Sequence, residues 1–180
     1  MTLCRSVAML ISLVLVPLTV AAAPPPEPTV EYSADSTMET EGGMTMKSRV
    51  YHTPTKQRME MGGADGSVTI IRKDKKVVWQ VMGDMYMEMP LDQSNAPDMG
   101  GFDIQEQTEV GEETVNGLKT TKTKIIATKP DGSKFGGFFW TTKEGVTVKM
   151  DLLSKDGDKK MRMASELTNV KIEKQNPALF

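Results

Sequence analysis

The chain has few of the residue types on which most catalytic and metal sites depend. It has one cysteine, Cys4, and one histidine, His52. Because Cys4 precedes an N-terminal apolar run, the chain beyond that run cannot form an internal disulfide, a thiolate nucleophile or a cysteine-ligated zinc site. Neither G-x-S-x-G nor H-E-x-x-H occurs. The sequence therefore predicts a non-catalytic protein, and we assign no catalytic residue, no cofactor and no metal ligand.

An excess of basic residues is also absent. The formal net charge is −2, and removal of residues 1–22 would take away Arg5 and no acidic residue, which leaves −3. Bulk attraction to nucleic acid is therefore not expected. The run "KDGDKK" lacks the ligand spacing of an EF-hand, so a β-turn is the favoured interpretation.

The first residues have the layout of a secretory signal peptide. Arg5 is followed by an apolar run from Val7 to Val20 and then by small residues. This run is too short for a stable membrane anchor, and we expect cleavage after Ala22. The lipid-bearing cysteine of a bacterial lipoprotein follows the apolar run, whereas Cys4 precedes it. The expected product is a periplasmic protein that is not a lipoprotein.

The rest of the chain predicts a single, mainly β domain. A stiff proline-rich lead-in spans residues 23–28, and residues 29–180 have the length of one domain. Apolar and polar residues alternate between frequent turn signals, and no helix of ordinary length is indicated. Counting the turns predicts about ten or eleven strands. Because an antiparallel sheet of that size has to curl, stack or close, we expect a strongly curved sheet or incomplete β-barrel with one buried face.

One segment interrupts this rhythm and is expected to form a lid. Residues 91–104 contain Pro97, Gly100 and Gly101, yet they also carry apolar residues that a polar loop would not need. A short helix or flap that covers an apolar surface would need them. The predicted lid residues are Leu91, Met99, Phe102 and Ile104.

Methionine is the abundant apolar residue. Thirteen methionines and six leucines follow residue 22, although leucine has better-defined rotamers and dominates ordinary cores. In "VMGDMYMEMP", alternation places Met85, Met87 and Met89 on one face of a strand. Several such M-x-M strands side by side would form a methionine wall, with Trp79 and either Phe139 or Trp140 as rigid parts. The predicted cavity lining is Tyr32, Met38, Met44, Met46, Met59, Met61, Trp79, Met85, Met87, Met89 and Trp140.

The methionine pattern leaves three interpretations open. A wall of flexible thioethers suits a cavity for an apolar ligand such as a lipid, but it also suits a filled core in an envelope structural or interaction domain. Thioethers are soft ligands that suit Cu(I), so a copper-binding protein is the third. The M-x-M pairs are spread over four strand segments, which counts against a metal, because a metal needs three or four ligands at one point.

Four stretches resemble a bacterial family of exported proteins. They are "VTIIRKDKKVVWQVMGDMYMEMP", "ETVNGLKTTKTKI", "FFWTTKEGVTVKMD" and "ELTNVKIEKQNPALF". The family is similar to the outer-membrane lipoprotein-sorting superfamily typified by LolA and LolB, and the resemblance covers roughly residues 30–180. It implies an incomplete antiparallel β-barrel with a lid and an apolar cavity, and a soluble carrier of acyl chains. The implied partners are a lipid or acyl-chain ligand and a transient membrane or envelope-protein partner.

Overall fold

Eleven antiparallel β-strands make up most of the fold. The computed structural model describes residues 26–62, 66–93, 103–128, 132–156 and 159–180. The strands are β1 (Tyr32–Thr40), β2 (Thr45–Thr53), β3 (Lys56–Met61), β4 (Val68–Arg72), β5 (Val77–Met82), β6 (Met85–Pro90), β7 (Asp103–Val115), β8 (Leu118–Thr128), β9 (Lys134–Thr141), β10 (Thr147–Asp156) and β11 (Lys159–Ile172). Within the described ranges the helical segments are two short 3-10 helices, η1 (Leu91–Gln93) and η3 (Pro177–Leu179).

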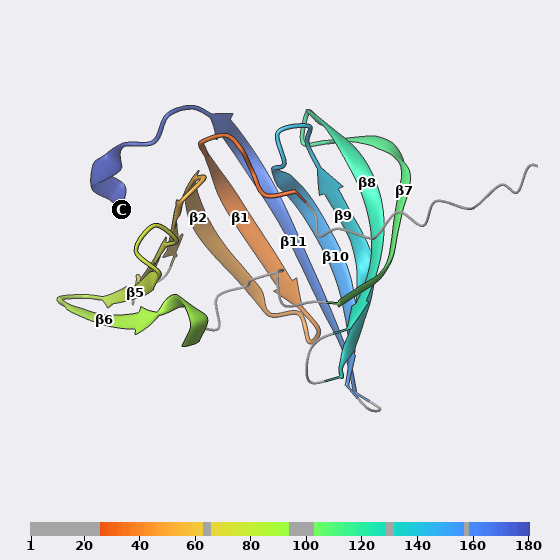
Figure 1. The fold of residues 1–180 in the computed structure, drawn as a ribbon, viewed down its shortest axis with the longest axis horizontal. Helices are drawn as coiled ribbons and strands as arrows, with labels where there is room; N and C mark the ends of the chain where they lie inside the picture. Colours follow the sequence, from red (N-terminus) through yellow and green to blue (C-terminus); the bar gives the residue numbers. More distant parts are fainter. Residues whose placement is uncertain (1–25, 63–65, 94–102, 129–131, 157–158) are drawn as a thin grey trace, which may run out of the picture.

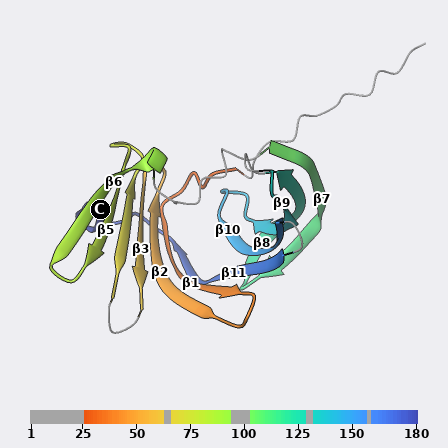
Figure 2. The same cartoon turned by 90° about the horizontal axis from the view of Figure 1, so that it is seen from below.

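All eleven strands belong to one open sheet. Their order is β6-β5-β4-β3-β2-β1-β11-β10-β9-β8-β7, so β6 and β7 are its edges and the first and last strands, β1 and β11, pair at its centre. Figures 1 and 2 show that the part from β1 through β11 to β7 curls strongly, while β2 to β6 extend away from the curl. The expected incomplete β-barrel is confirmed, and the number of strands lies within the predicted count.

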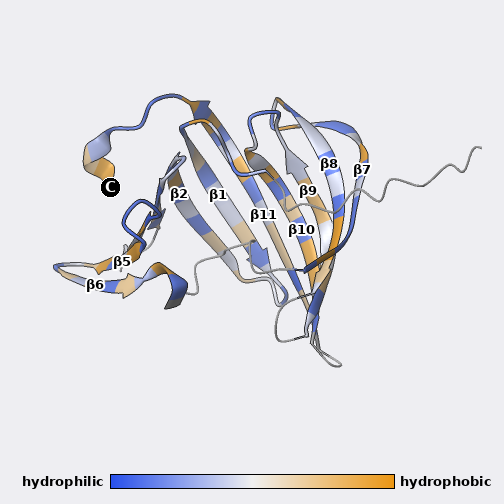
Figure 3. Ribbon diagram, in the orientation of Figure 1, coloured by the Kyte–Doolittle hydropathy of each residue, from blue (hydrophilic) through white to orange (hydrophobic). Residues whose placement is uncertain are grey.

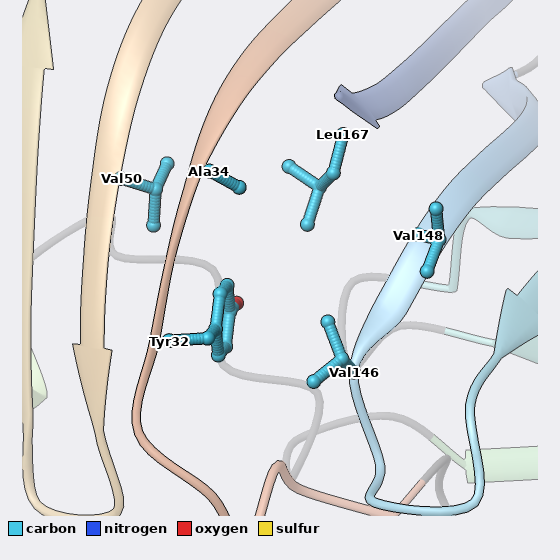
Figure 4. Close-up of a cluster of buried hydrophobic side chains, with 6 residues drawn as sticks. All are labelled: Tyr32, Ala34, Val50, Val146, Val148 and Leu167. Carbon is cyan, nitrogen blue, oxygen red and sulfur yellow. The ribbon is translucent and has the colours of Figure 1, made fainter. Parts of the chain in front are cut away.

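A first hydrophobic cluster lies inside the curl. Tyr32, Ala34 and Val50 of β1 and β2 point toward Val146, Val148 and Leu167, and Figure 4 shows the two groups facing each other. All six side chains are buried. Because burial of a valine or leucine side chain contributes roughly 1.5–3 kcal/mol, this cluster holds the central strands against β10 and the β9–β10 turn.

A second cluster is formed by side chains of β8, β9 and β10. Its buried members are Ile125, Ala127, Phe135, Phe139 and Leu152, and the half-buried residues packed against it include Ile104, Met150 and Met163. Ile104 is therefore part of strand β7 and of a strand core, and it is not a lid residue as the sequence predicted. Figure 3 shows apolar and polar residues alternating along these strands, as expected for a sheet with two different faces.

The segment from Glu27 to Glu31 crosses one end of the sheet (Figure 1). The Thr29 amide donates to the Glu144 carbonyl at 3.0 Å, and Lys73 donates to the Glu27 carboxylate at 2.6 Å. These contacts join the β9–β10 turn to the β4–β5 turn. Gly145 has a φ of 87°, and a Cβ there would lie 2.6 Å from the Glu27 carbonyl oxygen, so glycine is required where the segment crosses.

Two adjacent glycines of β9 mark a second close approach. A Cβ on Gly137 would overlap the backbone carbonyl oxygen of Asp151 and lie 2.9 Å from the Leu152 Cα. A Cβ on Gly136 would lie 3.3 Å from the Ile125 carbonyl oxygen. Strands β9 and β10 therefore approach each other more closely at Gly137 than an ordinary side chain permits.

We expect Gly137→Ala to lower the free energy of unfolding by more than the roughly 1–3 kcal/mol of ordinary overpacking, because backbone atoms must move. Gly136→Ala is the matched control, since its neighbour has to shift only slightly. Urea unfolding of both variants, followed by circular dichroism, measures the difference. Equal stability of the two variants would contradict the close approach.

Candidate ligand face

Every methionine in a described strand lies on one face of the sheet, which we call the methionine face. Directly opposed residues of neighbouring strands point to the same face, and so do residues two apart along a strand. Met38 is opposite Met46, for example, and Met82 is opposite Met85. The methionines of this face are Met38, Met46, Met59, Met61, Met82, Met85, Met87, Met89, Met150, Met161 and Met163.

The methionine face is only partly covered. Inside the curl it also carries Tyr32 and Val50, which are buried in the first cluster. Toward β6 its side chains are exposed, with 72% of Met85, 51% of Met87 and 44% of Met82 open to solvent. The other methionines of the face are half-buried, except for Met161, which is 60% exposed. The face thus carries methionines across the sheet, together with uncharged polar residues such as Thr69 and Gln80, and it is buried mainly at its centre.

Met44, another predicted lining residue, precedes β2 at the turn from β1. Its carbonyl accepts the Thr40 amide at 3.1 Å, and its side chain is exposed.

Both tryptophans lie on the opposite face, which we call the outer face. Trp79 is opposite Glu88, whereas its neighbour Gln80 is opposite Met87. Trp140 is opposite Lys149. The structure therefore does not bring Trp79 or Trp140 to the methionine face, contrary to the sequence prediction.

Phe139, the predicted alternative to Trp140, does lie on the methionine face. It is opposite Met150 and is buried in the second cluster. Trp140 is buried on the outer face instead, where its indole N–H donates to Glu113 at 2.7 Å and Lys122 and Lys149 lie over its ring. A strand with two consecutive aromatic residues presents one to each face, and its alternation alone does not say which face is covered.

Tyr32 is a predicted lining residue with a structural role. Its ring stacks on the imidazole of His52, with 5.0 Å between ring centroids. The Nδ1 atom of His52 lies 3.4 Å from the Val30 carbonyl oxygen. Burial raises the pKa of Tyr32 to about 12 and lowers the pKa of His52 from its usual value. This pair fixes the start of β1 against β2.

The predicted lid is described only at its two ends. Leu91 lies in η1, and its amide donates to the Lys76 carbonyl at 2.9 Å. Ile104 belongs to β7, and Met99 and Phe102 lie outside the described residues. A lid over the methionine face therefore stays a prediction.

A pocket of about 390 Å³ lies at the β5–β6 hairpin. Most of its lining, including Trp79, Val81, Tyr86 and Glu88, belongs to the outer face. It is therefore not the methionine-lined cavity that the sequence predicts, and that cavity also stays a prediction.

Ion pairs cover much of the outer face. Arg49 pairs with Asp35 at 2.8 Å, and hydrogen bonds from Asn169 and Arg49 lower the pKa of Asp35. The hydrogen bond from Arg72 likewise lowers the pKa of Asp74 to about 2. These carboxylates are engaged by cations on their own face. They supply no free acid or base to the methionine face.

The described residues contain neither a hard-ligand metal cluster nor a long apolar helix. In the part of the chain that the structure describes, no group of three or more histidine, cysteine, aspartate or glutamate residues is placed to hold a metal ion. No helix in the described ranges has the length and hydrophobicity needed to cross a membrane.

Comparison with known proteins identifies the fold. No protein-family model and no curated protein sequence matches the chain. Among solved structures, MucB matches with a TM-score of 0.54 and 11% identity over 83% of this chain and 56% of that one. The Pseudomonas aeruginosa MucA/MucB complex matches with a TM-score of 0.53 and 12% identity over 83% and 55%. The chain spans about half the length of these relatives.

A third match is an outer membrane lipoprotein-sorting protein domain from Vibrio parahaemolyticus. Its TM-score is 0.38 and its identity is 9%, over 80% of this chain and 86% of that one. At TM-scores of 0.53 and 0.54, the two MucB structures show that this chain shares their fold. Such low identities show the fold alone.

We expect the stability of the protein to fall between about pH 7.5 and about pH 5.5 because of His52. Its folded-state pKa is depressed, so the unfolded chain takes up a proton more readily as the pH drops through the usual value of about 6.5. The depressed carboxylate pKa values act only at lower pH, below the usual range of these groups. Denaturant unfolding at the two pH values measures the loss, and His52→Gln should reduce it. An unchanged pH dependence in that variant would contradict this assignment.

We expect dilute hydrogen peroxide to oxidise Met85 and Met161 before Met59 and Met163. The first two are largely exposed and the last two are half-buried, and oxidation to the sulfoxide requires access to the sulfur. Peptide mass spectrometry over a time course measures the order. A separate measurement should first verify that the protein unfolds slowly compared with oxidation. Equal oxidation rates at all four methionines would then show that the described exposure pattern is wrong.

Proposed function

We propose that this chain is a non-catalytic binding or carrier protein that holds a lipid or another apolar ligand against its methionine face. The observation that carries the proposal is the strand register, which gathers the methionines of seven strands on one side of an open sheet. Within the described residues, that side is incompletely covered. An apolar ligand would complete its burial.

The chemistry of this face suits a long, flexible apolar molecule. Transfer of an acyl chain from water contributes about 0.8 kcal/mol per buried methylene. Methionine side chains have three rotatable bonds and can follow ligands of irregular shape. Because the ion-paired carboxylates and cations lie on the outer face, the methionine face offers little for a charged substrate to bind.

The exposure pattern favours a ligand face over a wholly filled core. Met82, Met85 and Met87 are 44–72% exposed, whereas Ile125, Val146 and Val148 are completely buried. A protein that used its methionines only as core filling would bury them as it buries those three. We therefore place the filled-core interpretation second, limited to the two packed clusters.

The location and the partners that we propose go beyond what the fold alone indicates. The predicted signal peptide of residues 1–22 would deliver the chain to the periplasm. The neighbour MucB is solved as a complex with MucA, which supports a protein partner in this proposal. We propose a lipid or acyl-chain ligand and a transient membrane or envelope-protein partner for this chain.

The double variant Met46→Gln with Met61→Gln should weaken lipid binding. Both residues are half-buried on the methionine face, and the amide adds polar groups that an acyl chain cannot satisfy. Displacement of a fluorescent fatty acid by unlabelled fatty acid measures affinity. Native mass spectrometry of the protein isolated from a bacterial periplasm detects any lipid that copurifies.

Leu153→Gln is the matched control. Leu153 is 49% exposed and lies on the outer face, opposite Arg162, so this change should leave lipid binding unaltered. Equal binding by the wild type and the methionine variant, with both folded by circular dichroism, would contradict the assigned face. Absence of any exchangeable lipid on the wild type would contradict the carrier function itself.

A further inference from the structure

Three methionines converge at the turn of the β5–β6 hairpin. Met82 and Met85 are directly opposed across the two-residue turn formed by Gly83 and Asp84. Met87 follows Met85 on the same face, opposite Gln80. We propose that Met82, Met85 and Met87 form a thioether site that binds one Cu(I) ion, a function beyond the lipid binding proposed above.

The hairpin brings the three side chains within reach of one ion. Opposed residues of antiparallel strands have Cβ atoms about 4.5–5.5 Å apart, and diagonal neighbours are about 7–8 Å apart. Residues two apart along a strand are separated by about 6.8 Å. Three long side chains that start from the corners of so small a triangle can bring their sulfur atoms to a common point.

The two-residue turn keeps Met82 and Met85 close together. Gly83 has a φ of 58°, and glycine at the first position of a two-residue hairpin loop permits the tight turn. A longer loop would separate Met82 from Met85.

The ligand chemistry selects a soft monovalent ion. Neutral thioethers bind Cu(I) well and bind the hard cations Mg²⁺ and Ca²⁺ poorly. Among the described residues, no cluster of histidine, cysteine, aspartate and glutamate competes as a conventional metal site. Because thioethers carry no proton, the affinity of this site should be nearly independent of pH, unlike sites built from cysteine or histidine.

Exposure distinguishes these three methionines from the rest of the face, apart from Met161 of β11, which is 60% exposed. All three are at least 44% exposed, so core packing does not hold their sulfur atoms apart. The M-x-M pairs are spread over four strand segments, which counted against a metal site in the sequence. The close spacing of Met82, Met85 and Met87 answers that objection, because these three lie in one hairpin. Met82 lies outside any M-x-M pair in the sequence, and the turn adds it to Met85 and Met87.

An anaerobic titration of the protein against a colorimetric Cu(I) chelator tests the site. We expect the wild type to take one Cu(I) per chain from the chelator, with sulfur as the scatterer in X-ray absorption spectra. The variant Met82→Leu with Met85→Leu and Met87→Leu should lose this binding. The changes keep these positions apolar, so the circular dichroism spectrum should be unchanged.

A second methionine pair provides the matched control. Met38 and Met46 are directly opposed on the same face, and their change to leucine should leave Cu(I) binding intact. Three results would overturn the proposal: no transfer of Cu(I) from the chelator to the wild type, equal binding by the triple variant, or equal loss in the control. A steep fall in wild-type affinity from about pH 7 to about pH 5 would instead indicate His52 as a ligand and overturn it as well.

Discussion

The pairing of β1 with β11 is the constraint on which the rest of the structure depends. It joins two hairpin series, β1 to β6 and β7 to β11, whose strands are otherwise paired only within their own series. The register shifts between Ser33 and Asp35, opposite Asn169, whose φ is 51°. Because side chains alternate along a strand, a further one-residue slip would move Leu167 and Met163 to the outer face. The bulge is stabilised by the Asn169 amide, which donates to Asp35 at 2.7 Å.

This register gives the two faces of the sheet different side chains and different roles. The outer face uses ion pairs such as Arg162 with Asp151, which are exposed and contribute little individually to stability. Stability therefore depends mainly on the two buried clusters, and the remaining methionine face is available to a ligand without loss of the fold.

The sequence predicted the sheet and its methionine side well because both follow from alternation. Period-2 spacing alone places Met85, Met87 and Met89 together, whichever strands are their neighbours. It could not decide between Phe139 and Trp140, since that choice depends on which face curls inward. It also missed the place of Met82, because the contact with Met85 arises from the two-residue turn. The lid prediction failed at Ile104, where β7 begins earlier than the apolar pattern indicated.

Methionine explains how one face can suit both proposed ligands. Leucine would bury an acyl chain equally well but has no donor atom for a metal, whereas histidine or cysteine would bind a metal but add titratable groups to the apolar face. Thioethers are apolar, uncharged and flexible, so they serve either purpose. The two sites remain separable in space: the copper ligands lie at the β6 edge, where packing is weakest, and the half-buried methionines lie nearer the curl. A ligand that needs burial therefore favours the curl, and an ion that needs mobile side chains favours the edge.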